Sequence, residues 1–155
     1  MTIPVSKIAP SEYPAIVTLW EASVRATHDF LQEEDILFFR PLILNEYLKA
    51  VDLNCVRDDK GLILGFSGVA EGNLEMLFVH PDTSGKGVGK TLLIHAIKNQ
   101  LITKVDVNEQ NPKALEFYLK NGFKIISRSE LDGAGKPYPI LHLQLIDSDY
   151  PLSAQ

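Results

Sequence analysis

The stretch 77–97, LFVHPDTSGKGVGKTLLIHAI, joins a short apolar run to a helical pattern through a turn rich in glycine. Leu77, Phe78 and Val79 are prone to form a strand, which must end near Pro81 because proline cannot donate to a strand ladder. Beyond the turn, apolar residues recur at helical spacing, namely Val88, Leu92, Leu93, Ala96 and Ile97. The pattern therefore predicts a strand that enters a helix through glycines.

The turn itself contains three alternating glycines, Gly85, Gly87 and Gly89. Glycine lacks a Cβ, so its backbone adopts unusual φ values and approaches a ligand closely. The amides of such a turn and the free N–H groups at the start of the next helix converge on one point and favour an anion there. We therefore expect this turn to bind a phosphate group.

Two nucleotide-binding patterns match this turn only in part. A Walker-type loop would share the ending Gly89-Lys90-Thr91, but Ser84 stands where its first glycine belongs. A dinucleotide-binding fingerprint would need its last glycine one position beyond Gly89. A phosphate-binding turn of a third kind and a plain strand–helix connection remain, and the alternating glycines favour the former.

A second pattern lies between residues 108 and 123. Asn111 is suited to cap a helix, Pro112 to occupy its first position, and Asn121-Gly122 to end it. These signals predict a helix at 112–120. One face of this helix carries Ala114, Leu115 and Tyr118, so Tyr118 is expected to point toward the sheet.

Periodicity elsewhere predicts further elements around these two patterns. They are a first strand around Ile3 and Val5, helices at 14–27 and about 33–50, and strands at 53–57, 62–69, 105–107, 124–128 and 140–145. Pro41 removes a backbone donor, so the second helix must kink or split there. Tyr138, between two prolines, is either a rigid loop residue or part of a substrate wall.

Composition limits the class of protein. A chain of 155 residues with 45% hydrophobic and 23% charged residues suits one globular domain, and its net charge of −5 argues against nucleic-acid or anionic-membrane partners. The single cysteine, Cys55, rules out an internal disulfide, and the N-terminus lacks a signal-peptide pattern. No apolar stretch reaches the ~18 residues of a membrane span. We expect a cytoplasmic protein. The sequence contains no Cys/His cluster with the spacing of metal ligands, so we expect no bound metal.

The two motifs, in this order, resemble those of the GNAT superfamily of N-acetyltransferases. Val79-His80-Pro81 followed by Gly87-Val88-Gly89 is similar to the family's acyl-CoA pyrophosphate loop, except that Ser84 replaces the usual Gln or Arg. The second segment matches a family pattern that begins with Asn and ends with Gly-Phe, at Asn111, Ala114, Phe117, Tyr118, Gly122 and Phe123. The resemblance covers residues 3–145.

This resemblance implies an α/β (α+β) fold in a single domain at 1–147, followed by a C-terminal tail at 148–155. The expected architecture is a mixed sheet of about seven strands with about four helices, in the order βααβββαβαββ. In this family the strand at 77–79 and the strand at 105–107 splay apart, and acetyl-CoA enters the gap between them.

The activity implied by the resemblance is transfer of the acetyl group of acetyl-CoA, the co-substrate, to a primary amine by direct attack in a ternary complex. Backbone groups of Leu77 and Val79 would pair with the pantetheine arm, and amides of the glycine turn would hold the pyrophosphate. The expected cofactor-binding set is Leu77, Phe78, Val79, Ser84, Gly85, Lys86, Gly87, Val88, Gly89, Lys90, Asn111 and Tyr118.

Tyr118 is the expected proton donor to the leaving thiolate, while the general base is Glu75, Asp106 or His28. His28, in the loop between the first two helices, is equally compatible with a core position. If the strands are regular, Glu75 shares one face with Leu77 and Val79. The acceptor is a small-molecule or protein amine, and the chain is a monomer or a homodimer. A catalytically silent acyl-CoA-binding regulatory domain is the alternative from another functional class.

Overall fold

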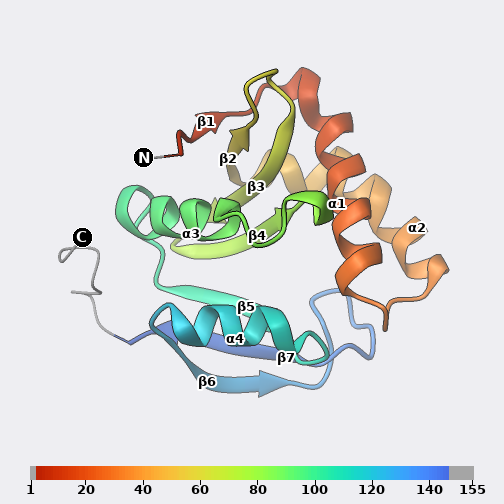
Figure 1. Ribbon diagram of the computed structural model, residues 1–155. Helices are drawn as coiled ribbons and strands as arrows, with labels where there is room; N and C mark the ends of the chain where they lie inside the picture. The colour runs from red at the N-terminus through yellow and green to blue at the C-terminus, as the bar shows by residue number, and fades with distance from the viewer. Residues whose placement is uncertain (1–2, 147–155) are drawn as a thin grey trace.

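The computed structural model describes residues 3–146, which form a seven-stranded mixed sheet with helices on both faces (Figure 1). The strands are β1 (Ser6–Lys7), β2 (Asp52–Arg57), β3 (Ile63–Ala70), β4 (Asn73–Val79), β5 (Lys104–Asn108), β6 (Phe123–Ser129) and β7 (Ile140–Leu145). The longer helices are α1 (Tyr13–Thr27), α2 (Glu33–Leu42), α3 (Val88–Asn99) and α4 (Pro112–Lys120). The strands lie in the spatial order β1-β2-β3-β4-β5-β7-β6. The tail expected at 148–155 lies outside the described residues.

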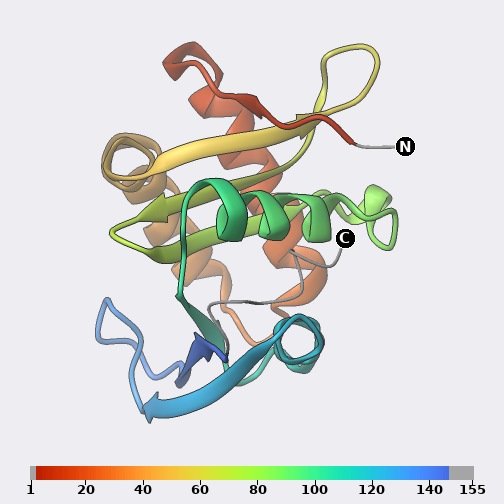
Figure 2. The same cartoon turned by 90° about the vertical axis from the view of Figure 1, so that its left-hand side faces the viewer.

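Each face of the sheet has its own hydrophobic core. Figure 2 shows α3 in front of β2–β4, with α1 and α2 behind these strands. The core on the α1 and α2 side contains Trp20 and Phe66, and it includes Cys55, which is fully buried as a small core residue. The core on the α3 and α4 side contains Leu93 and Tyr118. Apolar residues at helical spacing thus face the sheet in every longer helix.

The predicted element order is confirmed, with two local differences. The helical stretch 33–50 is split as Pro41 requires: α2 ends one residue later, and a π-helical turn (Ile43–Tyr47) and a 3-10 turn (Leu48–Ala50) follow. The first strand was expected around Ile3 and Val5, but β1 begins after them. Pro4 separates these two residues and cannot donate to the ladder, so their side chains only pack on the core under α3.

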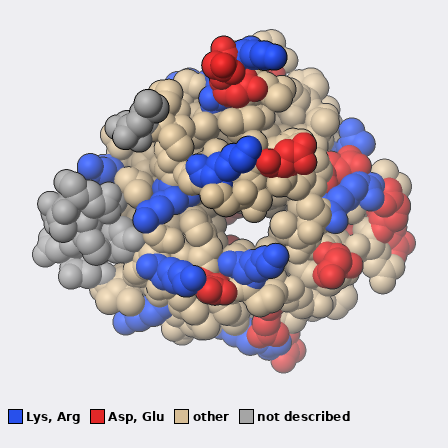
Figure 3. All heavy atoms as spheres, in the orientation of Figure 1, with Lys and Arg blue, Asp and Glu red and all other residues tan. Residues whose placement is uncertain are grey.

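Strands β4 and β5 pair over a very short length. Their parallel register contains only Asn73 opposite Lys104 and Leu74 opposite Val105. Beyond these pairs the two strands diverge, and β5 continues with β7 as its antiparallel partner. The space-filling view shows an opening between the half that carries β4 and the half that carries β5 and α4, with Lys and Arg side chains around it (Figure 3). The expected gap between splayed strands is therefore present.

A β-bulge in β4 determines the position of Glu75. The register pairs Met76 with Gly68 and Leu74 with Val69, which leaves Glu75 as the extra residue. As a result Leu74 packs on the same core as Leu77, although regular alternation would put these two on opposite faces. Glu75 was expected to share a face with Leu77 and Val79 only if the strand were regular, and the bulge removes that condition.

Candidate active site

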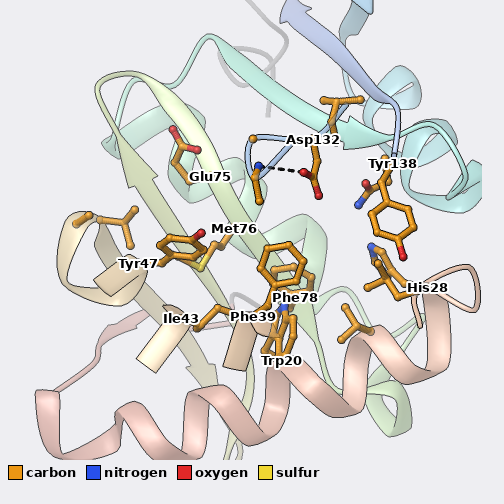
Figure 4. Close-up of a pocket in the computed structure, with 18 of the residues that line it drawn as sticks. Trp20, His28, Phe39, Ile43, Tyr47, Glu75, Met76, Phe78, Asp132 and Tyr138 are labelled. Atoms are coloured by element: carbon orange, nitrogen blue, oxygen red, sulfur yellow. Dashed lines mark hydrogen bonds between the residues drawn. The ribbon is translucent and has the colours of Figure 1, made fainter. Parts of the chain in front are cut away.

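A cavity of about 520 Å³ lies on the α1 and α2 side of the sheet, next to the divergence of β4 and β5. Its walls come from α1, the π-helical turn, β4 and the loop that connects β6 to β7. Most of the lining is apolar or aromatic, and includes Trp20, Phe39, Tyr47, Met76, Phe78 and Tyr138 (Figure 4). Such a lining with few polar groups is typical of a small-molecule or side-chain binding site.

Glu75 lies at one end of this cavity, whereas His28 and Tyr138 lie at the other (Figure 4). Glu75 also lines a neighbouring groove of about 370 Å³, together with Asp106 and His142. Partial burial raises the pKa of the Glu75 carboxyl, and the negative charges of Asp106 and Glu71 raise it further. A carboxylate with a raised pKa is better matched to accepting a proton near neutral pH.

Asp106, the second candidate base, is engaged elsewhere. Its Oδ1 lies 2.7 Å from Nδ1 of His142, and Nε2 of His142 lies 2.6 Å from Oγ of Ser129. Asp106 lines the groove but not the large cavity. Of the three candidate bases, the structure therefore brings Glu75 and His28 into one cavity and places Asp106 beside it.

His28 lies where α1 ends, with its backbone N–H donating to the carbonyl of Val24. Its Nδ1 is 2.7 Å from Oγ1 of Thr27, and its ring packs near Phe30 and Phe78, with centroids 5.2 and 6.4 Å away. Burial lowers the pKa of the imidazole to about 4, although the charge of Asp29 opposes this shift. His28 is therefore neutral at physiological pH, and it is a weak proton acceptor inside an aromatic wall.

The glycine turn has the backbone that its sequence predicts. Gly85 and Gly87 have φ values of 81° and 85°, in the left-handed region that glycine favours, and α3 begins directly after Gly87. Lys86 and Lys90 are exposed and form no ion pair within the described residues 3–146. Ser84 is also exposed. Free helix amides and unpaired cations thus lie together at this turn.

Two members of the expected cofactor-binding set, Val88 and Gly89, lie against neighbouring side chains of the fold. The side chain of Val88 is only 4% exposed and packs against Val56 and Leu92, so only its backbone is available to a ligand. Gly89 faces Val79 and Phe117, where a Cβ would meet the nearest side-chain atoms at 3.6 and 3.8 Å. These are ordinary van der Waals distances.

The edge of β4 that faces the opening has free backbone groups. The N–H of His80 donates to the carbonyl of Leu64 in β3 at 2.8 Å. Hydrogen-bonded and non-hydrogen-bonded positions alternate along an antiparallel pair. The backbone of Phe78 therefore also bonds to β3, whereas the N–H and C=O groups of Leu77 and Val79 point to the edge from which β5 has diverged. An extended ligand arm could pair with this edge as a strand would.

Asn111 caps α4, and its Oδ1 accepts a hydrogen bond from the N–H of Ala114 at 3.2 Å. The Nδ2 group has no partner within the described part of the chain. The sequence suggests both helix capping and ligand binding for this side chain. The geometry separates them, because the oxygen caps the helix and the nitrogen stays available as a donor.

Tyr118 points from α4 into the core below the β4–β5 gap, as its helix position predicts. It packs with Leu74 of β4 and Val107 of β5, and its ring lies 5.1 Å from Phe117 and 5.8 Å from Phe123. Burial raises the pKa of the phenol above its ordinary value. Tyr118 therefore keeps its proton throughout the neutral range.

Comparison with known proteins identifies the class of protein that this fold and site define. The family model described as "Acetyltransferase (GNAT) domain" matches residues 52–125. The peptidyl-lysine N-acetyltransferase YjaB of Salmonella typhimurium is 36% identical over 143 residues, which cover 92% of this chain and 98% of that protein. The chain belongs to the GNAT acetyltransferases, whose acetyl donor is acetyl-CoA.

Solved structures agree with this assignment. The solution structure of apo YjaB from Escherichia coli, at 36% identity, has a TM-score of 0.82 and covers 94% of this chain and 99% of its own. The PaiA N-acetyltransferase of Thermoplasma acidophilum, solved with coenzyme A, shares the fold with a TM-score of 0.69 at 24% identity, with coverages of 93% and 99%. Membership of this family does not favour the Walker-type alternative for the glycine turn.

No helix within residues 3–146 is long and apolar enough to cross a membrane. No group of three or more His, Cys, Asp or Glu side chains in the same range is placed to hold a metal ion.

Sequence patterns did not reveal the aromatic lining of the cavity. Trp20 and Phe39 follow ordinary helical periodicity, so they looked like core residues, and they do pack on the core. Tyr138 was the one residue of this lining that the sequence suggested, because a tyrosine held between two prolines was already a candidate for a substrate wall. It lines the cavity.

Proposed function

We propose that the chain acetylates the side-chain amine of lysine residues in peptides or proteins. The observation that carries this proposal is the cavity beside the β4–β5 gap, which has apolar walls and a carboxylate, Glu75, at one end. A lysine side chain is an aliphatic stem that ends in an ammonium group, so it matches both features. The naming of the YjaB relatives as peptidyl-lysine N-acetyltransferases supports the same acceptor.

The groups on the opposite side of the gap are suited to bind acetyl-CoA, the acetyl donor. Acetyl-CoA, when bound, supplies the acetyl thioester. The free β4 edge at Leu77 and Val79 would pair with the pantetheine arm, and Nδ2 of Asn111 would donate to the same arm. Amides of the glycine turn and of the first turn of α3 would hold the pyrophosphate, with Lys86 and Lys90 adding positive charge.

Two side chains would move protons. Glu75 would accept a proton from the acceptor ammonium and so produce the neutral amine that attacks. Tyr118 would donate its phenolic proton to the departing sulfur. His28, neutral and packed at a tilt against aromatic rings, would serve as part of the acceptor wall. We propose the cytoplasm as the compartment, which the single, buried and unpaired Cys55 supports.

The acceptor is tested with a peptide that carries one lysine and a blocked α-amino group. We expect release of free CoA thiol in step with acetylation of the peptide, and no release with the same peptide after Lys→Gln replacement. Turnover on free polyamines but not on this peptide would remove the peptidyl-lysine proposal. Binding of acetyl-CoA without turnover on any amine would favour the silent regulatory domain.

Replacement of Glu75 by Gln should lower kcat/KM by about tenfold, because water in the open groove partly replaces the lost base. In the unaltered chain kcat/KM should rise with pH as Glu75 ionises, with a midpoint above the ordinary glutamate value because its pKa is raised. The measurement is a pH–rate profile at saturating acetyl-CoA.

The matched control for this prediction is Glu71→Gln. It removes a neighbouring negative charge that raises the pKa of Glu75 but leaves the base in place. The acidic limb of the profile should then move to lower pH while the plateau rate persists. An unchanged rate and limb in Glu75→Gln would show that Glu75 is not the base.

A further inference from the structure

The loop at 130–139, between β6 and β7, forms one wall of the acceptor cavity. Asp132 fixes the shape of this loop, because its Oδ1 accepts hydrogen bonds from the N–H groups of Ala134 and Lys136, each at 2.9 Å. Residues at both ends of the loop, Asp132 and Tyr138, line the cavity (Figure 4). The position of this loop therefore determines the shape of the cavity on that side.

A buried carboxylate attaches the loop to α2. Asp35, in the first turn of α2, is only 7% exposed. It accepts a short hydrogen bond from the hydroxyl of Tyr138, and its Oδ1 lies 2.9 Å from Nζ of Lys136. The same Nζ lies 4.4 Å from the ring centroid of Phe38, also in α2. Two residues of the loop are thus attached to one helix.

The attached tyrosine continues an aromatic wall that reaches β4. The ring of Tyr138 packs near Phe30 at 5.8 Å, Phe30 lies 5.2 Å from His28, and His28 lies 6.4 Å from Phe78 of β4. Phe30 and His28 belong to the connection between α1 and α2. Moving Tyr138 would therefore open the wall at the end of the cavity opposite Glu75.

The attachment is strong because it depends on a charged, nearly buried group. The hydrogen bond from Tyr138, and then the one from Lys136, lower the pKa of Asp35, so the carboxylate is ionised at neutral pH. A buried carboxylate that loses a donor is costly, so the arrangement favours the observed position of the loop. The attachment lies outside the elements proposed to bind acetyl-CoA, because neither the glycine turn nor α4 contains Asp35, Lys136 or Tyr138.

We propose that Asp35 is a positioning residue that holds Tyr138 as a wall of the acceptor cavity and so makes the enzyme prefer a lysine within a peptide over a small free amine. The inference rests on the proposed lysine acetylation. A small amine occupies only the end of the cavity near Glu75. A peptide also places the neighbours of its lysine against the Tyr138 end, and only these contacts need the wall.

The test compares two acceptors, the blocked lysine peptide and n-butylamine, in the full chain and in Asp35→Ala, Asp35→Asn and Tyr138→Phe. We expect Asp35→Ala and Tyr138→Phe to raise KM for the peptide about tenfold, the value of one lost charge-assisted hydrogen bond. Asp35→Asn keeps an accepting oxygen and should have a smaller effect. For all three variants, kcat, KM for n-butylamine and the thermal shift with CoA should stay within about twofold of the unaltered chain.

A double variant and a control make the test specific. Asp35→Ala with Tyr138→Phe should raise KM for the peptide no further than either change alone, because both remove the same contact. Glu109→Gln breaks the exposed pair with Arg128 and should leave the peptide-to-butylamine ratio unchanged. An equal loss on both acceptors, or an unchanged peptide KM, would overturn the positioning role while lysine acetylation stands. Absence of transfer to either acceptor by the unaltered chain would overturn both proposals.

Discussion

Replacement of Tyr118 by Phe is expected to lower kcat by at least about tenfold, because general acids typically contribute ~10²–10⁴-fold and water partly replaces the lost proton donor. The ring packs in the core below the β4–β5 gap and stays in the variant, so the fold and acetyl-CoA binding should persist. Only the hydroxyl is lost, which in the proposed reaction acts when charge develops on the sulfur. The phenol has a raised pKa, so its ionisation should cause no loss of rate below pH ~10.

The measurement is kcat for the lysine peptide and the melting temperature, both on one preparation. Tyr13→Phe, at the start of α1 and outside the linings of the cavity and the groove, is the matched control and should turn over normally. If Tyr118 only stabilised the core, its variant would melt at a lower temperature yet keep full kcat. That result would leave the reaction without a proton donor to the sulfur.

Replacement of Gly87 by Val is expected to abolish thermal stabilisation by CoA. A ligand at 100 times its Kd adds about 2.7 kcal/mol to the free energy of unfolding if it binds only the folded state. Gly87 has a φ of 85° at the start of α3, where the amides converge, so a β-branched side chain would obstruct the phosphates and distort the turn. The measurement is the melting temperature with and without CoA.

A control variant separates the backbone strain caused by valine from the loss of CoA binding. Gly61, in the turn between β2 and β3, has nearly the same φ of 87° and open space around it. Gly61→Val should therefore lose a similar ~1–2 kcal/mol of intrinsic stability but keep the full CoA shift. A full shift in Gly87→Val would contradict the pyrophosphate assignment. Stabilisation by Mg-ATP in place of CoA would return the turn to the Walker class.

Short-range sequence signals were sufficient to predict much of the part of the site proposed to bind acetyl-CoA. The φ values of the glycine turn, the start of α3 and the cap of α4 depend on residues within a few positions of each other. Tyr118 faces the sheet because helical spacing places it on the same side as the buried core. The sequence alone therefore determined where the candidate phosphate-binding turn and the candidate acid lie.

Contacts between residues far apart in the sequence decided the structure of the cavity proposed to bind the acceptor amine. Glu75 reaches the cavity because β3 and β4 pair with a bulge, and a register between two strands is a tertiary property that periodicity does not contain. The attachment of Tyr138 to Asp35 joins residues 103 positions apart. Each of these residues follows an ordinary local pattern in its own element. Only the packing of α2 against the loop at 130–139 brings the buried carboxylate to its two donors, and with them Tyr138 to the wall of the cavity.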